Sequence, residues 1–273
     1  MIQGCVYIFA VQSKAQWEIM QIERRSNGSE SAYFVKENQE LLGSAQTLQD
    51  ALARRVTPVK NPEAWTTRLV PCEPTKIVCI GLNYRQHAEE MNKSIPDAPL
   101  MFLKPPSALL ADGGTIVRPA VSKEVHYEAE LAVVIAQTSK DLAIEDVPRA
   151  IAGYTLFNDV TARDLQRKDV QYTRGKGFDT FAVVGPRIVT GIAPDALEIR
   201  LRLNGETRQS SPVSDMIFSV HELVAYVSQM MTLMPGDVIA TGTPSGVGEL
   251  HAGDVVEVEI EEIGVLRNAV RDA

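Results

Sequence analysis

The segment HYEAELAVVI, residues 126–135, decides how the rest of this chain is interpreted. Its second half is an unbroken apolar run, which is typical of a buried strand. Because residues i and i+2 of a strand share a face, Glu128 and Glu130 would point the same way. Adjacent buried carboxylates repel and are costly unless a cation lies between them. The segment therefore predicts oxygen ligands for a hard divalent cation.

A second predicted strand supports this metal site. Residues 153–160 have the composition of a buried strand, and Asp159 stands near its end. Glu128, Glu130 and Asp159 could thus offer three carboxylates to Mg²⁺ or Mn²⁺, with Ca²⁺ as a further hard cation. The simpler alternative is a solvated strand face that carries two acids.

His87 and Glu90 form a second candidate pair, within GLNYRQHAEE at residues 81–90. Residues three apart are neighbours on a helix, and a carboxylate beside an imidazole raises the basicity of the ring and fixes its tautomer. Such a pair suits a general base that activates water. The simpler alternative is a surface histidine near an acid. No histidine has the spacing of a zinc motif, which disfavours a zinc hydrolase.

Two loops could complete a site. Lys176 lies between two glycines, where the ordinary interpretation is a solvated charge and the alternative is a cation presented to a substrate anion. Residues 241–248, TGTPSGVG, form a glycine-rich turn that lacks the GK[ST] of a phosphate-binding loop. This turn either only joins strands or offers backbone N–H groups and a hydroxyl to an anion.

Short strands dominate the rest of the pattern, which predicts a mixed, β-rich α+β fold. Helical periodicity is clearest at residues 220–231, where Ser219 and Glu222 form a capping box, and a shorter helix is predicted at 144–150. The strands predicted after residue 75 are 76–80, 100–103, 115–117, 127–136, 153–160, 181–184, 187–190, 198–203, 237–241 and 254–260.

The first 70 residues differ from the remainder of the chain. We predict a small β-rich domain at 1–70, with strands at 6–10 and 17–22 and a helix at 48–54 capped by Thr47. Four prolines between residues 58 and 74 then mark a linker. Residues 71–273 form the predicted catalytic domain.

Composition excludes several classes of protein. The net charge is −8 and the basic residues are scattered, so no nucleic-acid partner is expected. Three cysteines without paired spacing argue against a disulfide framework and favour a reduced, cytoplasmic location. No stretch approaches the roughly 18 apolar residues of a membrane helix, so we expect a soluble protein without a membrane partner.

Seven stretches, in this order, resemble the fumarylacetoacetate hydrolase family from about Pro74 onward. The resemblance implies a β-roll catalytic domain, behind a small variable N-terminal domain and usually in a homodimer. Longer members carry a fourth metal-site carboxylate shortly before the histidine. Residues 77–83 contain no acid, so this chain resembles the shorter, three-carboxylate branch. The stretches are GLNYRQHAEE, FLKPPSAL, HYEAELAVVI, FNDVTARDLQ, KGFDTF, PGDVIATGTPSGVG and IGVLRNAV.

The resemblance also implies roles for nine residues around a small 2-oxo acid. Part of the chain, from Asn83 to Pro99, would close over the bound substrate. The implied metal ligands are Glu128, Glu130 and Asp159, the implied catalytic residues are His87, Glu90 and Lys176, and the implied substrate contacts are Gln166, Thr243 and Arg163.

The implied reaction is hydrolysis of a C–C bond in an acylpyruvate-type 2-oxo acid through a metal-bound enolate. The same enolate serves isomerisation of 2-hydroxyhepta-2,4-diene-1,7-dioate in aromatic catabolism, and decarboxylation of oxaloacetate. The His87–Glu90 pair favours hydrolysis among these. A non-enzymatic alternative is an idle family member that acts as a binding protein, which the intact set of candidate residues disfavours.

Overall fold

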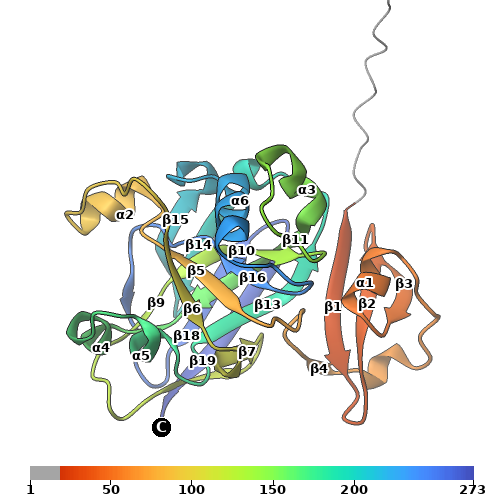
Figure 1. The fold of residues 1–273 in the computed structure, drawn as a ribbon. Coiled ribbons are helices and arrows are strands. Elements are labelled where there is room, and N and C mark those ends of the chain that lie inside the picture. Colours follow the sequence, from red (N-terminus) through yellow and green to blue (C-terminus); the bar gives the residue numbers. More distant parts are fainter. Residues whose placement is uncertain (1–18) are drawn as a thin grey trace, which may run out of the picture.

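Figure 1 shows the computed structural model, which describes residues 19–273. Three β-sheets form the body of the molecule, and short helices lie around them. Strands account for 42% of the structure and helices for 20%, so the predicted mixed, β-rich class is confirmed. The strand predicted at 6–10 lies outside the described residues.

The largest sheet has eleven strands and is built around β10 (Ala129–Ile135). β10 is antiparallel to β11 (Ile151–Asp159) on one side and to β16 (Val238–Ala240) on the other. The strand order is β3-β2-β1-β13-β11-β10-β16-β5-β6, with β4 beside β1 and β7 beside β13. Its remaining strands are β1 (Met20–Ser26), β2 (Ser31–Glu37), β3 (Glu40–Ala45), β4 (Thr67–Arg68), β5 (Ile77–Gly81), β6 (Leu100–Lys104), β7 (Leu109–Ala111) and β13 (Ala182–Val189).

Two smaller sheets complete the body. A five-stranded sheet has the order β15-β14-β18-β19-β8, and a three-stranded sheet has the order β12-β9-β17. Their strands are β8 (Thr115–Arg118), β9 (Val125–Tyr127), β12 (Thr161–Ala162), β14 (Glu198–Leu203), β15 (Glu206–Pro212), β17 (Gly248–Glu249), β18 (Val255–Ile260) and β19 (Gly264–Asp272).

The helices are short, and two of them begin where their caps predict. The Ser219 hydroxyl accepts from the Glu222 backbone and the Glu222 carboxylate accepts in return, so the predicted capping box of α6 (Val220–Met230) is confirmed. Thr47 likewise caps α1 (Leu48–Leu52). Within residues 19–273, no helix is long and apolar enough to cross a membrane. The other helices are α2 (Arg85–Glu90), α3 (Val147–Ala150), α4 (Arg163–Lys168) and α5 (Thr173–Lys176), and 3₁₀ turns lie at Pro62–Ala64, Pro106–Ala108, Ile144–Asp146, Pro194–Ala196 and Val213–Asp215.

The apolar run of β10 is buried on both faces of the largest sheet. Leu131, Val133 and Ile135 point into one hydrophobic core, and Ala132 and Val134 point into a second core on the opposite face. All five are fully buried. Burial of a Val, Leu or Ile side chain contributes about 1.5–3 kcal/mol. The strand is therefore a firmly held support for the acids at its beginning.

The N-terminal strands β1, β2 and β3 form an antiparallel meander against which α1 packs, at the right of Figure 1. β1 also pairs with β13, with Ile22 opposite Ile188, so the largest sheet runs from the N-terminal strands into the rest of the molecule. The second hydrophobic core contains residues from both parts. The domain boundary at residue 70 stays a prediction.

Three element predictions were wrong. The strand predicted at 127–136 is interrupted at Glu128. The two strands predicted at 181–184 and 187–190 are one strand, β13, because Gly185-Pro186 lies within it instead of ending it. The helix predicted at 144–150 is a 3₁₀ turn followed by a single α-helical turn. In addition, β15 and β19 had no predicted counterpart.

Candidate metal centre

Three carboxylates converge where β10 and β11 lie side by side. Glu128 directly precedes β10, Glu130 is its second residue, and Asp159 ends β11. One oxygen from each carboxylate lies within 4.8 Å of the others, and all three residues are buried. The structure therefore brings together the three acids that the sequence singled out, and the solvated strand face is excluded as their setting.

The interruption at Glu128 is caused by a side chain that replaces a strand partner. The Glu128 backbone N–H donates to the Asn158 side-chain oxygen at 3.0 Å, and the Asp159 N–H donates to the Glu128 carbonyl at 2.9 Å. These two bonds tie the end of β11 to the residue that precedes β10. Glu128 and Asp159 are thus held beside each other by backbone as well as by side chains.

Buried cations surround the acids. The Lys176 ammonium donates to Glu128 Oε2 at 2.8 Å and to Asp159 Oδ2 at 2.6 Å. Lys104 forms an ion pair with Asp159 Oδ1 and donates to the Val160 carbonyl at 2.9 Å. Lys176 is 2% exposed and Lys104 is 1% exposed. The ordinary interpretation of Lys176 as a solvated loop charge was therefore wrong, because this residue ends α5 facing two carboxylates.

Arg163, the first residue of α4, is the third cation of the cluster. Its guanidinium forms an ion pair with Glu128 Oε1 and donates to the Gln166 side-chain oxygen at 2.7 Å. Gln166 lies one turn further along the same helix. The arginine thus connects the first metal-ligand candidate to a predicted substrate contact.

Charge and burial shift the pKa values of Glu128 and Glu130 in opposite directions. Burial alone would raise the pKa of Glu128, but Arg163 and Lys176 outweigh it and hold that pKa below its usual range. Burial, reinforced by the charges of Asp159 and Glu128, raises the pKa of Glu130 well above its usual range. Among the ion pairs of residues 19–273, none involves Glu130. A bound cation would therefore receive its largest electrostatic stabilisation from Glu130.

The His87–Glu90 pair lies on α2, which directly follows β5. His87 Nδ1 lies 3.0 Å from Glu90 Oε2, and His87 is only 8% exposed. The imidazole lies close enough to Glu128 to interact electrostatically with that acid. The interpretation of His87 as a surface histidine was therefore wrong. Asn83 anchors the start of this segment by donating to the Thr241 carbonyl at 2.8 Å.

The glycine-rich turn at residues 241–248 connects the acids to α2. The Gly242 N–H donates to Glu130 Oε2 at 2.8 Å, and the Gly246 N–H donates to Glu90 Oε1 at 3.2 Å. Gly242 has φ +99°, and a Cβ there would lie 2.8 Å from the Asn83 Cβ, so the turn requires glycine at this position. The turn therefore does more than join strands, and Thr243 directly follows the residue that binds Glu130.

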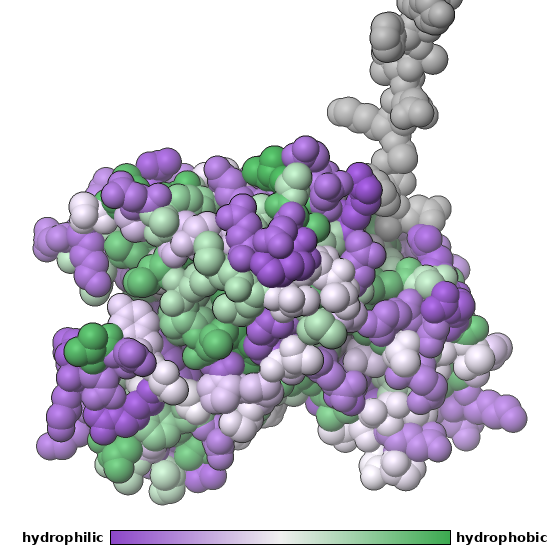
Figure 2. Space-filling view, in the orientation of Figure 1, coloured by the Kyte–Doolittle hydropathy of each residue, from purple (hydrophilic) through white to green (hydrophobic). Residues whose placement is uncertain are grey.

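Figure 2 shows where the molecule is hollowed. The surface is indented between the lobe that carries α2 and the lobe that carries α4 and α5. His87 belongs to the first lobe, and Gln166 and Lys176 belong to the second. The indentation thus lies between the helices that carry these predicted site residues.

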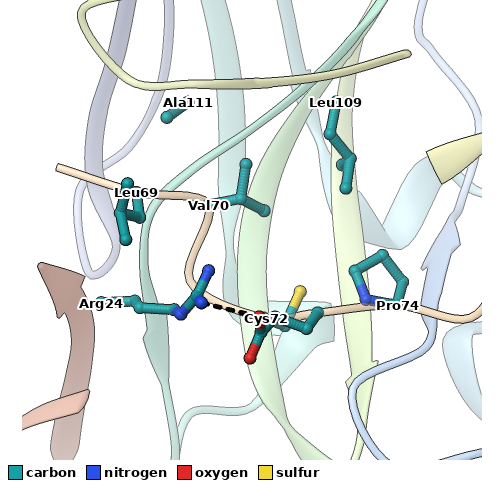
Figure 3. A pocket seen from close by; sticks show the side chains of 8 residues that line it. Arg24, Leu69, Val70, Cys72, Pro74, Leu109 and Ala111 are labelled. Atoms are coloured by element: carbon teal, nitrogen blue, oxygen red, sulfur yellow. Dashed lines mark hydrogen bonds and ion pairs between the residues drawn. The ribbon is translucent and has the colours of Figure 1, made fainter. Parts of the chain in front are cut away.

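A separate cavity lies between the N-terminal strands and β7. It has a volume of about 400 Å³, Figure 3 shows Arg24 and Cys72 among its lining side chains, and Arg24 forms an ion pair with Glu73 at 2.6 Å. None of the predicted site residues lines it. Its residues are Arg24, Leu69, Val70, Cys72, Glu73, Pro74, Leu109 and Ala111.

Three residues around the acids were not assigned a role from the sequence: Lys104, Asn158 and Gln209. Lys104 and Asn158 stood within quoted motifs, FLKPPSAL and FNDVTARDLQ, but the sequence does not show which partner each finds. Gln209 gave no signal, because its partners Ala129 and Thr243 are far away in the chain.

The donor set fits a hard divalent cation. The cluster offers only carboxylate oxygens, and within the described residues it includes neither histidine nor cysteine. Oxygen-only sets suit Mg²⁺, Mn²⁺ and Ca²⁺, whereas zinc prefers nitrogen and sulfur. Glu130 has no ion-pair partner among residues 19–273, so a bound cation is expected to stabilise this carboxylate most. The residues present therefore fit the predicted type of metal.

These features define a class of protein: a sheet-built molecule with a buried carboxylate cluster for a hard cation and a histidine–glutamate pair beside it. A model of the fumarylacetoacetate (FAA) hydrolase C-terminal family matches residues 76–271. The chain therefore belongs to the fumarylacetoacetate hydrolase family, and the resemblance drawn from the seven motifs is confirmed.

Proteins of different activity are similar to this chain. A mitochondrial oxaloacetate tautomerase of Rattus norvegicus is 44% identical over 77% of this chain and 71% of its own length. The crystal structure of a 2-hydroxyhepta-2,4-diene-1,7-dioate isomerase from Mycobacterium marinum has a TM-score of 0.81 and 39% identity, covering 93% of this chain and 98% of its own. A fumarylpyruvate hydrolase from Pseudomonas aeruginosa, in complex with Mn²⁺ and pyruvate, has a TM-score of 0.70 and 32% identity, covering 76% and 93%.

Proposed function

We propose that this protein is an enzyme that acts on a small 2-oxo acid through its enolate, with Mg²⁺ or Mn²⁺ held by Glu128, Glu130 and Asp159. The observation that carries the proposal is the buried acid triad beside the His87–Glu90 pair. A divalent cation at these acids would supply Lewis acidity that stabilises negative charge on a 2-oxo group. The similar hydrolase, whose crystal structure contains Mn²⁺ and pyruvate, supports this choice of metal and of substrate class.

The chain supplies a positioned base. When the Nδ1–H of His87 donates to Glu90, Nε2 is the basic nitrogen of the ring. Glu90 is itself held by the Gly246 N–H, so the imidazole keeps its orientation. His87 can therefore remove a proton from water or from the carbon beside the 2-oxo group.

Acylpyruvate hydrolysis is the reaction that we place first. His87 takes a proton from a water molecule, whose oxygen bonds to the distal carbonyl carbon. The C–C bond then breaks, the acyl fragment leaves as a carboxylic acid that keeps the water oxygen, the electron pair of the broken bond stays on the pyruvate fragment as the enolate, and protonation of that enolate gives pyruvate. Lys176, Gln166 and Thr243 would hold the 2-oxo acid and its developing charge.

Keto–enol interconversion of oxaloacetate is the second candidate, because a tautomerase is 44% identical to this chain. The same base would move a proton between C3 and the 2-oxo oxygen, without attack by water. Isomerisation of the dienoate, the activity that names the similar protein of Mycobacterium marinum, would likewise move a proton from the enol oxygen to a carbon, here C5 of the diene, without cleavage.

Pyruvate release from an acylpyruvate and loss of enol oxaloacetate absorbance would be measured side by side, with Mn²⁺ and then with chelator. We expect chelator-sensitive turnover in at least one assay, and its abolition in Glu128→Gln. Pyruvate from the acylpyruvate supports hydrolysis, whereas enol loss alone supports the tautomerase. Absence of both, in protein shown to bind Mn²⁺, would sink both candidates and leave the dienoate isomerase or an idle binding protein.

Matched variants distinguish a loss of activity caused at the site from a general effect of substitution on the protein. His87→Asn should lower either turnover by about 10²–10⁴-fold, as expected for loss of a general base. The exposed His251→Asn and Glu261→Gln make the same chemical changes away from the acids and should retain activity. Equal losses in His251→Asn would show that His87 has no special role.

A further inference from the structure

Gln209 lies on β15, yet its side chain reaches the candidate metal centre of the largest sheet. It is 1% exposed. The Gln209 side-chain oxygen accepts from the Ala129 N–H at 3.0 Å, and Ala129 is the residue between Glu128 and Glu130. The Gln209 amide nitrogen donates to Thr243 Oγ1 at 2.9 Å and to the Pro244 carbonyl at 2.8 Å. One buried amide thus joins the strand of acids to the glycine-rich turn.

These three bonds fix the direction of the amide. Ala129 offers only an N–H and Pro244 offers only a carbonyl, so the oxygen and the nitrogen of Gln209 cannot exchange places. Both amide hydrogens are then committed, one to Pro244 and one to Thr243. The turn is also seated closely on β15, because a Cβ at Gly246 would lie 2.2 Å from the Arg208 carbonyl oxygen.

The direction of the amide decides what the Thr243 hydroxyl can do. Because Thr243 Oγ1 accepts from Gln209, its own hydrogen must point elsewhere. The structure gives this hydroxyl no acceptor within residues 19–273, although Thr243 is only 5% exposed. The preceding residue, Gly242, contacts Glu130. A hydroxyl donor without an acceptor among the described residues therefore directly follows the residue that binds Glu130.

We propose that Gln209 is a positioning residue that makes the Thr243 hydroxyl a dedicated hydrogen-bond donor to the ligand. The ligand group at this position is then an acceptor, such as a carboxylate oxygen of the 2-oxo acid. This inference rests on the proposed function, because it concerns the anion bound at that same site. A buried donor left unpaired costs about 1–3 kcal/mol, so the site favours ligands that fill this position with an acceptor.

A double-mutant cycle tests the assignment in the Mn²⁺-loaded protein. The dissociation constants of pyruvate and of Mn²⁺ alone would be measured calorimetrically for wild type, Gln209→Met, Thr243→Val and the double variant. We expect each single change to weaken pyruvate binding about tenfold. The double variant should be no weaker than Thr243→Val, because Gln209 acts through Thr243. Mn²⁺ affinity should be unchanged throughout.

Two further variants are controls for a defect in folding. Thr243→Ser keeps the hydroxyl and should bind pyruvate as wild type does. Gln229→Met makes the same change at an exposed glutamine of α6 and should have no effect. Three outcomes would each overturn the assignment. The losses of pyruvate affinity could multiply in the double variant, Gln209→Met could lose Mn²⁺ affinity as much as pyruvate affinity, or Gln209→Met could bind pyruvate as tightly as the wild type. Failure of the wild type to bind pyruvate with Mn²⁺ is a different result, which contradicts the proposed function itself.

Discussion

Lys104 is the residue whose removal should cost the most stability around the acids. Its ammonium is fully buried between Asp159 and the Val160 carbonyl. Removing one partner of a buried ion pair leaves the other charge poorly compensated and typically costs about 3 kcal/mol. We therefore expect Lys104→Met to lower the free energy of unfolding by about that amount, as measured by urea titration.

The control for this prediction is Lys123→Met, which makes the same change at an exposed lysine without a side-chain partner among the described residues. Its free energy of unfolding should stay within about 0.5 kcal/mol of the wild type. A Lys104→Met protein as stable as this control would show that the buried lysine is dispensable.

Cys72 and Cys79 should be unreactive in the folded protein. Both are about 1% exposed or less. Burial raises the pKa of the Cys72 thiol to about 12 and that of Cys79 well above its usual range, so little thiolate forms at pH 8. In a Cys5→Ser background, iodoacetamide should label neither thiol until urea unfolds the chain. Rapid labelling of either one without urea, detected by mass spectrometry, would contradict the burial described.

The site shows which residues local sequence can predict. Glu128 and Glu130 were found from their spacing of two, which depends only on the neighbouring chain. Lys104 and Gln209 were missed because each meets its partner across a distant part of the chain, and no local pattern records that meeting. The burial of Lys176 was missed because flanking glycines indicate a loop and not the charges that the loop will meet.

At the scale of an element, the glycine-rich turn should tolerate no side chain at its second residue. Alanine at Gly242 would combine a left-handed φ with contact to Asn83, so Gly242→Ala should cost more than about 2 kcal/mol of unfolding free energy. Gly205→Ala is the matched control, because Gly205 has φ +83° with nothing within 4 Å of the added Cβ. It should cost about 1 kcal/mol. Equal midpoints in urea for both variants would refute the close packing of the turn.

Elements were predicted well where their signals are local. The Ser219 capping box is a contact between residues three apart, so the beginning of α6 could be read from the chain. The interruption of the predicted strand at Glu128 could not be predicted in this way, because the Asn158 side chain that binds the Glu128 N–H belongs to another strand. The prediction of two strands on either side of Gly185-Pro186 was wrong for the same reason. The position of this pair in the middle of a sheet depends on β11, with Thr155 donating to the Gly185 carbonyl at 3.2 Å.

At the scale of the whole molecule, the pairing of β1 with β13 should make the N-terminal strands unfold with the rest. Ile188 is fully buried in the core shared by both parts. Ile188→Ala should cost about 3 kcal/mol, through lost burial and the cavity left behind. In a Trp17→Phe background, the fluorescence of Trp65, which packs against Phe34 on β2, reports on the N-terminal part.

Far-UV circular dichroism reports on all sheets. Both signals should shift to lower urea together in Ile188→Ala, as expected for one cooperative unit. If the Trp65 signal is lost first while the dichroism keeps a second transition, the predicted domain of residues 1–70 unfolds independently of the shared sheet.

The cations around the acids have a consequence for how a product would leave. When all are ionised, Lys104, Lys176 and Arg163 balance Glu128, Glu130 and Asp159 in charge, so the six side chains together are neutral. A divalent cation then leaves two positive charges in a poorly hydrated space, and a ligand with two negative charges balances them. The enolate of pyruvate, the product of the hydrolysis proposed above, carries two, whereas pyruvate itself carries one. Protonation of the enolate would thus leave an excess positive charge in the site and weaken the binding of the pyruvate formed. Electroneutrality would in this way couple proton transfer to product release.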